Sequence, residues 1–383
     1  PMEMPRRNVE TLKVLLSNLI ILSNGNWMYM SKVYALGAKV MCNNVVGLVG
    51  TQRTLCRENP EVMTSIGRGA KQGLEQCQKQ FKHDRWNCST IDEDSSVFGK
   101  LMHRSNKETA FVHAITSAGV VYEVTRACSR GELRECNCDK KSKEISEKDG
   151  FKWGGCSENV GYGIQFARTF IDSRESQQDP PALMNLHNNK VGRRAVRRLM
   201  ELQCKCHGVS GSCAVKSCWK QMMPFETVGN LLRQKYLFAI KVTVDQEGKS
   251  LTKVNKMKKP SGEAIVYLEE SPDYCMKNKA TGSSGTGGRE CNRTASGVGS
   301  CAVLCCGRGF DTIEMDDESK CDCQFHWCCY VKCKNCRYKI DKNFCKAPAE
   351  SVNSGLRSRQ PPRKKRNVRS LEIHNQVRKS VVI

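Results

Sequence analysis

Ser212 and His207 are the first pair of side chains in this sequence that could do chemistry together. They lie in the stretch CKCHGVSGSC at 204–213, and a serine that is activated by a histidine is the nucleophile of many hydrolases. The stretch contains two serines, Ser210 and Ser212, and neither has the pattern G-x-S-x-G around it. The stretch also contains no acidic residue to orient the imidazole. The sequence therefore predicts no catalytic residue and no enzyme, and a hydrolase is only a distant alternative.

The cysteines around His207 raise a second possibility, a zinc site. Cysteines also cluster in CDC at 321–323, WCC at 327–329 and KCKNC at 332–336. Tetrahedral zinc sites favour repeated C-x2-C pairs, whereas C-x-C and adjacent cysteines dominate here and only CKNC has that spacing. We therefore expect neither a metal nor another cofactor.

Disulfide bonds fit these cysteines better. The chain has 383 residues and 24 cysteines, and an even, dense set is typical of proteins that fold in an oxidising compartment. Cys206 and Cys213 bracket HGVSGS, and Cys204 and Cys218 could close a second bridge outside them. Four cysteines allow three pairings, so spacing alone leaves the choice open.

Nested bridges would hold the base of a hairpin with GVSGS at its tip. The tip would then present the hydroxyl of Ser212 to solvent, as a site that an enzyme could modify. We expect Gly208 and Gly211 to turn the tip with positive φ and to leave space around Ser212.

Three further features indicate secretion. The apolar run VLLSNLIIL at 14–22 follows basic residues and resembles a signal peptide, which we place at 1–25. Asn87 and Asn292 lie in sequons for N-linked glycans. The formal net charge is +23, and an extracellular protein this basic meets sulfated glycans such as heparan sulfate before it meets nucleic acid.

Helical periodicity dominates from about residue 58 to 240. Apolar residues at every third or fourth position place Phe111, Ile115 and Tyr122 on one face of a helix. The same spacing at 161–172 predicts another helix. Both apolar stripes are most simply explained as core.

A third helix is predicted over 191–204, with Val191, Ala195, Leu199 and Leu202 on its apolar side. The opposite side carries four arginines that could bind a polyanion: Arg193, Arg194, Arg197 and Arg198. A solvated basic face on an ordinary packed helix explains the same pattern, so both interpretations stay open.

The sequence changes character after residue 240. Alternating apolar residues, glycine, proline and lysines at 241–272 predict a hairpin and a linker. Twelve cysteines then fall between Cys275 and Cys345 among few large aliphatic residues, which predicts β-hairpins held by disulfides. The basic segment 347–383 lacks periodicity and is expected to be a disordered tail.

The expected fold class is therefore α+β. We expect a helical N-terminal domain over 26–245 with a protruding, disulfide-stapled β-hairpin. A linker over 246–272 would lead to a small cystine-rich β-hairpin domain over 273–346.

Several segments resemble the Wnt family of secreted signalling glycoproteins, in the family's order. Besides CKCHGVSGSC they are EQCQKQFKHDRWNCS at 75–89, FVHAITSAGVVYEVTRACS at 111–129, WGGCSENVGYG at 153–163, LMNLHNNKVGR at 183–193, CNRT at 291–294, CCGRGF at 305–310 and CQFHWCCYVKC at 323–333. NNVVGLVGTQRTLC and SPDYC resemble Wnt subfamily two most. The resemblance covers roughly 42–346, and the 38 residues after Cys345 are not explained by it.

The resemblance implies a secreted, receptor-binding ligand of the extracellular space and matrix. It implies that a membrane-bound acyltransferase esterifies Ser212 with palmitoleate and that a Wntless-type carrier takes part in secretion. The lipid-bearing tip, with His207, Gly208, Val209 and Gly211, would enter a groove of the Frizzled cysteine-rich domain.

A second Frizzled contact is implied at a hairpin tip in the C-terminal domain. There the resemblance places Phe325 and Trp327 beside a disulfide between the adjacent Cys328 and Cys329. From the residues alone, Trp327 could equally be the core of a tiny domain.

The resemblance also implies an LDL-receptor-related co-receptor and β-catenin signalling. We place the co-receptor against LHNNKVGR at 186–193 and the linker, although Asn188 and Asn189 could equally cap a helix. The rival function is that of a heparin-binding matrix protein without receptor activity.

The disulfide pairing is also implied by the resemblance. It joins Cys77 with Cys88, Cys128 with Cys136, Cys138 with Cys156, Cys204 with Cys218, Cys206 with Cys213, Cys275 with Cys306, Cys291 with Cys301, Cys305 with Cys345, Cys321 with Cys336, Cys323 with Cys333, and Cys328 with Cys329. We expect the remaining Cys42 and Cys56 to pair with each other.

Overall fold

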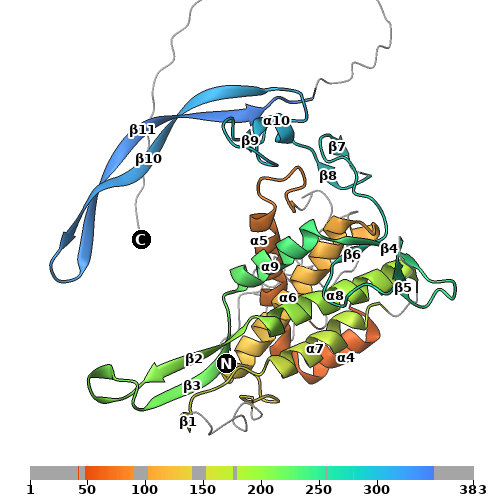
Figure 1. Cartoon of the computed structure of the whole chain (residues 1–383), viewed down its shortest axis with the longest axis vertical. Coiled ribbons are helices and arrows are strands. Elements are labelled where there is room, and N and C mark those ends of the chain that lie inside the picture. The colour runs from red at the N-terminus through yellow and green to blue at the C-terminus, as the bar shows by residue number, and fades with distance from the viewer. Residues whose placement is uncertain are drawn as a thin grey trace, which may run out of the picture. The chain divides into compact units, whose positions relative to one another are not determined.

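Helix α6 (Lys107–Ser129) is the centre around which the other long helices pack (Figure 1). The computed structural model describes residues 42, 48–89, 102–139, 152–175, 179–254, 258–278 and 280–348. Of the 23 residues of α6, 20 are buried, so the helix is enclosed on every side rather than on the one face that its periodicity predicted. The reason is that neighbouring helices contact it from several directions.

The helices in contact with α6 are α5 (Pro60–Gln80), α7 (Val160–Asp172), α8 (Pro180–Arg198) and α9 (Phe225–Leu237), and α4 (Gly50–Glu58) packs on α5 and α7. Helix α7 confirms the prediction at 161–172. Helices α5 and α6 are in close contact where Gly69 and Gly119 meet, since a Cβ on Gly119 would lie 2.2 Å from the carbonyl oxygen of Gly69.

Helix α8 ends earlier than predicted. It begins after Asp179, whose Oδ1 accepts a hydrogen bond from the amide of Ala182, and it ends at Arg198. Strand β2 (Met200–Cys206) follows at once, so Leu202 is on a strand and half exposed. The predicted helix over 191–204 is therefore wrong beyond 198, because the backbone of 200–206 pairs with a second strand.

Two small sheets lie beside the helices. The first contains β1 (Lys152–Trp153), β3 (Lys216–Met222) and β2 in the order β1-β3-β2. The second contains β5 (Leu251–Lys253), β4 (Ile240–Val244) and β6 (Val266–Tyr267) in the order β5-β4-β6. Strands β4 and β5 form the hairpin predicted after residue 240, and their sheet packs on α8 through Met184, Val242, Leu251 and Val266.

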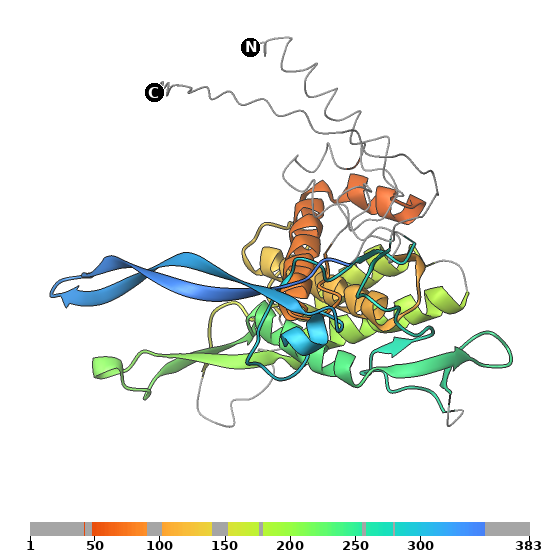
Figure 2. The same ribbon diagram turned by 90° about the horizontal axis from the view of Figure 1, so that it is seen from above.

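The segment after residue 273 has little core of its own. Its buried cluster consists of Leu304 and the cystines formed by Cys291, Cys301, Cys305 and Cys345. The elements are β7 (Lys277–Asn278), β8 (Ser283–Ser284), β9 (Glu290–Cys291), α10 (Cys301–Leu304), β10 (Phe310–His326) and β11 (Tyr330–Cys345). Strands β10 and β11 form a long, twisted antiparallel ribbon (Figure 2).

The loop after α5 connects this segment to the helices. The guanidinium group of Arg289 donates to the carbonyl oxygens of Lys82 and Arg85, at 3.0 and 2.7 Å. Arg85 in turn donates to the carbonyl oxygen of Val303, and the rings of Trp86 and Tyr274 lie 6.4 Å apart. The described residues belong to one compact unit that ends at Pro348.

The structure confirms the α+β class and the division into helical and cystine-rich regions. No helix among the described residues has the length and apolar character needed to cross a membrane. The predicted signal peptide and all but the first two residues of the predicted tail lie outside the described residues. The proposed domain boundaries stay predictions.

Candidate functional site

The hairpin of β2 and β3 carries Ser212 at its tip, and two nested disulfides hold it together. Cys204 lies directly opposite Cys218 in the strand register and bonds to it, with their Cα atoms 4.1 Å apart. Cys206 bonds to Cys213 nearer the tip. The nested pairing that spacing alone left open is therefore the one in the structure.

Backbone hydrogen bonds close the tip around Ser212. The amide of Gly208 donates to the carbonyl oxygen of Ser212 at 2.8 Å, and the amide of Ser212 donates to the carbonyl oxygen of Val209 at 3.1 Å. Between them lies a single 3-10 turn, Val209–Gly211, in which Ser210 and Gly211 have φ of 55° and 76°. Ser212 itself is exposed.

Gly208 is needed for a different reason from the one predicted. Its φ is −69°, which any residue can adopt, so the prediction of positive φ holds for Gly211 and is wrong for Gly208. A Cβ on Gly208 would lie 2.1 Å from the Oγ of Ser212 and 2.5 Å from its carbonyl oxygen. Position 208 therefore excludes every side chain because Ser212 folds back over it.

His207 does not activate Ser212. Its Nε2 lies 3.1 Å from the Oγ of Ser217, on β3, and its amide donates to the carbonyl oxygen of Val215. Within the described residues, the hydrogen bonds of this ring include none to a carboxylate. The geometry is that of a hairpin residue, and it gives Ser212 no general base.

The base of the hairpin is fixed to the helical region through the segment before α7. The amides of Gly154 and Glu158 donate to the carbonyl oxygens of Cys218 and Lys220 on β3. The carboxylate of Glu158 accepts a hydrogen bond from the amide of Met222, and burial raises the pKa of Glu158 above its ordinary value. The tip is thus presented on a mounted and cross-linked arm.

Exposed apolar side chains follow this arm. Val209 is 89% exposed at the tip, and Val215 and Leu202 are exposed along the strands and their connection. Val215 was not among the predicted site residues, and Leu202 was predicted to lie on a helix. Alternation of Leu202, Cys204 and Cys206 with the polar Gln203 and Lys205 was the signal that could have revealed a strand with one apolar side.

The ribbon of β10 and β11 carries the second predicted contact at its tip. Trp327 is 93% exposed and Phe325 is 68% exposed, so Trp327 is not the core of a small domain. The rings of His326 and Tyr330 stack at 5.0 Å where the strands end. Disulfides Cys321–Cys336 and Cys323–Cys333 brace the ribbon just below the tip.

Comparison with known proteins identifies the family to which this chain belongs. Residues 44–346, most of the chain, match the Wnt family. The chain belongs to the Wnt family. It is 50% identical over 329 residues to protein Wnt-2b-A of Xenopus laevis, a match that covers 85% of this chain and 93% of that relative.

A solved structure is also similar. One chain of the structure of human WLS in complex with WNT8A matches with a TM-score of 0.55 and 40% sequence identity, over 74% of this chain and 93% of that chain. These matches confirm the predicted likeness to Wnt subfamily two and the predicted fold class. Members of the Wnt family are secreted signalling ligands rather than enzymes.

The disulfide set of this Wnt chain differs from the prediction at one place. All ten predicted bridges outside the ribbon tip are present, and Cys42 bonds to Cys56. The thiols of Cys328 and Cys329 are free, with 3.1 Å between the sulfurs. An S–S bond is about 2.05 Å long, so at 3.1 Å the predicted bond between these adjacent cysteines is not formed here.

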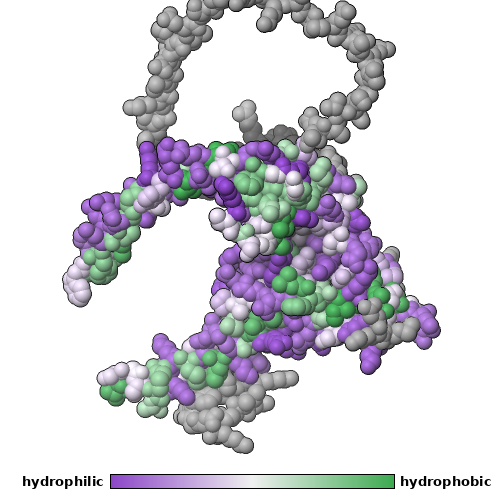
Figure 3. All heavy atoms as spheres, turned by 45° about the horizontal axis from the view of Figure 1, so that its top comes forward, coloured by the Kyte–Doolittle hydropathy of each residue, from purple (hydrophilic) through white to green (hydrophobic). Residues whose placement is uncertain are grey.

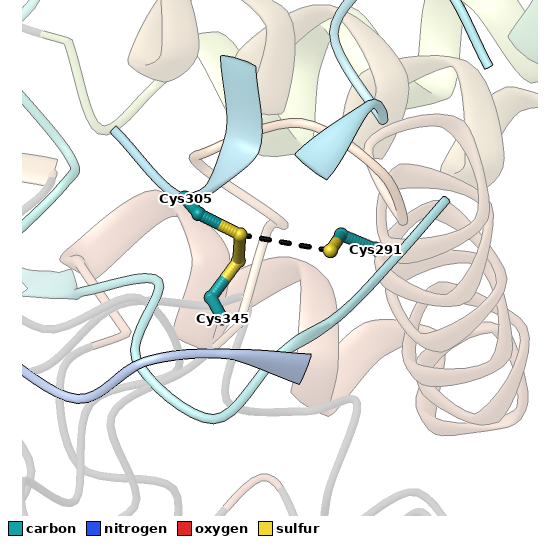
Figure 4. Close-up of side chains that lie close together, drawn as sticks. All are labelled: Cys291, Cys305 and Cys345. Carbon is teal, nitrogen blue, oxygen red and sulfur yellow. Dashed lines mark hydrogen bonds between the residues drawn. A yellow bond between two sulfur atoms is a disulfide. The ribbon is translucent and has the colours of Figure 1, made fainter. Parts of the chain in front are cut away.

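One group of sulfurs resembles a metal site only at first sight. The Sγ of Cys305 lies 3.6 Å from the Sγ of Cys291, beside Cys345 (Figure 4). Cys305 is bonded to Cys345, and Cys291 to Cys301. Metal binding requires thiolates, so these sulfurs are not a ligand set.

The four arginines predicted to bind a polyanion do not share one role. Arg193 is 5% exposed and makes a two-pronged ion pair with Asp172, at 2.8 Å for each bond. It therefore cannot reach a polyanion, and its prediction as a contact is wrong. Arg194, Arg197 and Arg198 are exposed, although Arg198 pairs with Glu263 at 2.7 Å.

Asn188 and Asn189 are neither caps nor surface contacts. Both are buried in the middle of α8. The amide of Asn188 donates to the carbonyl oxygen of Val266 and accepts from its backbone amide, which holds β6 against the helix. Asn189 contacts His113 and Asp172, so both asparagines have structural partners, and the predicted co-receptor contact of 186–193 and the linker stays a prediction.

The two sequons differ in exposure. Asn292 is exposed, and its Oδ1 accepts hydrogen bonds from Thr294 and Ala295. Asn87 is half-buried, and the Oγ of its sequon residue Ser89 lies 3.2 Å from the Oγ of Ser284. Glycosylation at both asparagines stays a prediction.

Proposed function

We propose that this Wnt ligand carries palmitoleate on Ser212 and binds the Frizzled cysteine-rich domain through both hairpin tips. The observation that supports this most directly is the exposed hydroxyl of Ser212 on a doubly cross-linked arm, without a histidine to activate it. Such a hydroxyl is suited to being modified by another enzyme rather than to performing catalysis.

An acyl chain on Ser212 would supply most of the contact at this tip. Each buried methylene contributes about 0.8 kcal/mol, and Val209 is the main apolar side chain beside the acylated residue. His207, Gly208 and Gly211 would then shape the tip that carries the lipid. Because the arm is braced, little conformational freedom is lost when the lipid enters its groove.

The second tip would contact the receptor through Trp327 and Phe325. An aromatic side chain that is nearly fully exposed at the end of a rigid ribbon is typical of an anchor that becomes buried on binding. Cys328 and Cys329 form the turn that presents Trp327. Two separate rigid contacts on one receptor domain would add their effects without a large continuous interface.

We further propose the partners that accompany this function. A membrane-bound acyltransferase would modify Ser212, and the solved relative in complex with WLS supports a Wntless-type carrier during secretion. An LDL-receptor-related co-receptor would bind the linker and the exposed residues of 186–193, not the buried Asn188 and Asn189. Signalling through β-catenin would follow. Heparan sulfate would bind Arg194, Arg197 and Arg198.

Mass spectrometry of the secreted protein tests the central proposal. The peptide that contains 204–213 should carry the mass of palmitoleate on Ser212. The variant Ser212→Ala should lose the acyl group and activity in a β-catenin reporter assay, whereas Ser210→Ala, two residues away on the same tip, should retain both. Full reporter activity of Ser212→Ala, or an unmodified Ser212 in an active protein, contradicts the proposal.

A further inference from the structure

The stem of the β10–β11 ribbon has one apolar face that nothing in the described part of the chain covers. Met315 lies opposite Ile340 in the register. Ile313 and Tyr338 each lie two residues away along their own strands, on either side of this pair. Alternate residues of a strand, and directly opposed residues of an antiparallel pair, share a face. Ile313, Met315 and Tyr338 are exposed, and we call these three residues and Ile340 the apolar stem face. Asp317 and Lys342 border it on the same side, opposite Tyr338 and Ile313, and Lys342 pairs with Glu290 at 3.5 Å.

The opposite face of the stem is charged, and two ion pairs on it lie within the ribbon. Arg337 pairs with Glu318, and Lys339 pairs with Glu314 at 2.9 Å. Figure 3 shows the corresponding contrast, with green and pale side chains along one side of the ribbon and purple along the other. The ribbon is thus a two-stranded sheet with a charged side and a side whose centre is apolar and unpartnered in the described part of the chain, and such ribbons gain stability from a further layer.

The two strands of the stem carry opposite charge. Strand β10 contains six carboxylates and one lysine, whereas β11 contains five cationic side chains and one carboxylate. Strand β10 forms one edge of its sheet, because the order is β10-β11-β9, and β11 is paired with β9 only at Asn343 and Phe344. Most of the stem therefore presents an acidic edge and a basic edge.

We propose that the apolar stem face is a dimerisation surface that binds a second copy of this chain. Charge selects the arrangement. When two ribbons stack face to face about a twofold axis parallel to their strands, the acidic β10 of one copy lies over the basic β11 of the other. The alternative, with the axis across the strands, places like charges over each other.

This arrangement predicts its own side-chain contacts. Each Met315 packs on the Ile340 of the other copy, and each Asp317 faces the hydroxyl of the other Tyr338, because the register pairs Met315 with Ile340 and Asp317 with Tyr338. The contact is isologous, so it closes at two copies. It uses residues below the irregularity between Cys321 and Gln324, and it does not depend on the proposed receptor contacts at the tip.

Sedimentation equilibrium of the full chain tests the inference in the background of Ser212→Ala, which removes association through the lipid. The chain should show a concentration-dependent dimer, and Met315→Lys should raise its Kd about tenfold or more because it buries a charge. Thr312→Lys is the matched control: it adds the same side chain and the same single charge to β10 but on the opposite face, and it should leave the Kd nearly unchanged.

A mixing experiment tests the orientation. Met315→Glu and Ile340→Lys should each dimerise poorly alone, but an equimolar mixture of the two, with different tags, should form the heterodimer because position 315 of one copy faces position 340 of the other. A chain that stays monomeric at all concentrations overturns the proposal, as does equal loss with Thr312→Lys. A monomer in which Met315→Lys weakens binding of the receptor domain assigns the face to the receptor and also overturns it.

Discussion

Replacement of Gly208 by alanine should prevent acylation of Ser212 without unfolding the protein. The new Cβ would lie 2.1 Å from the Oγ of Ser212 and 2.5 Å from its carbonyl oxygen, whereas unstrained contacts with carbon lie at about 3.5 Å. One of the atoms in conflict is backbone, so rotation of the Ser212 side chain does not remove the clash. The tip must open by roughly 1 Å.

The size of the effect follows from the hydrogen bonds that this opening breaks. The bonds from Gly208 to Ser212 and from Ser212 to Val209 close the tip, and each contributes about 1 kcal/mol. With residual strain, the tip conformation loses about 2–3 kcal/mol, which lowers its population by about 30- to 150-fold. The bridges Cys204–Cys218 and Cys206–Cys213 keep the arm itself intact.

The assay is the acylated fraction of the 204–218 peptide in secreted and cell-retained protein, measured by mass spectrometry. Gly211→Asn is the matched control, because position 211 has open space and a φ of 76° that asparagine tolerates. Gly208→Ala should lose nearly all palmitoleate, and Gly211→Asn should retain most of it. Normal acylation of Gly208→Ala would refute the view that Ser212 must fold over position 208.

Three further predictions concern the helical region. Arg193→Gln leaves Asp172 without its buried partner and should destabilise the fold by about 3–5 kcal/mol in urea unfolding, whereas Arg197→Gln should leave stability unchanged and lower the salt needed for elution from heparin. Burial lowers the pKa of His113 from 6.5 to about 4. Between pH 6.5 and pH 4 the imidazole is therefore protonated in the unfolded chain but not in the folded one, and the free energy of unfolding should fall by about 2 kcal/mol from pH 7 to pH 5. His113→Gln should flatten the dependence of stability on pH in this range. Asn188→Ala removes two buried hydrogen bonds to the backbone of β6 and should cost about 2–4 kcal/mol in the same unfolding assay, and an unchanged midpoint would show that α8 does not hold this strand.

Features governed by nearby residues could be read from the sequence. The bridge between Cys206 and Cys213 closes a loop of seven positions, so cysteine spacing and glycine content were enough to suggest a stapled tip. The helix at 160–172 could be predicted in the same way, because its periodicity lies within its own residues.

Features governed by distant residues could not be predicted. Arg193 and Arg197 lie on one short basic stretch, and periodicity assigns both to the polar side. Only Arg193 meets Asp172, which is 21 positions away, and Asn188 meets Val266 across 78 positions. A polar residue in a helix can be a surface contact or a buried clamp, and the partner that decides between them is absent from its local sequence.

Gly208 shows a third case, in which the sequence indicated the right residue for the wrong physical reason. Glycine in a turn suggests positive φ, yet Gly208 has an ordinary φ and lacks room for a Cβ because the Oγ and carbonyl oxygen of Ser212 lie against it. The two reasons predict different substitutions to be tolerated. A position in the αL region accepts asparagine, whereas a position without room for a Cβ accepts no side chain. Gly208→Asn should therefore lose acylation of Ser212 as completely as Gly208→Ala.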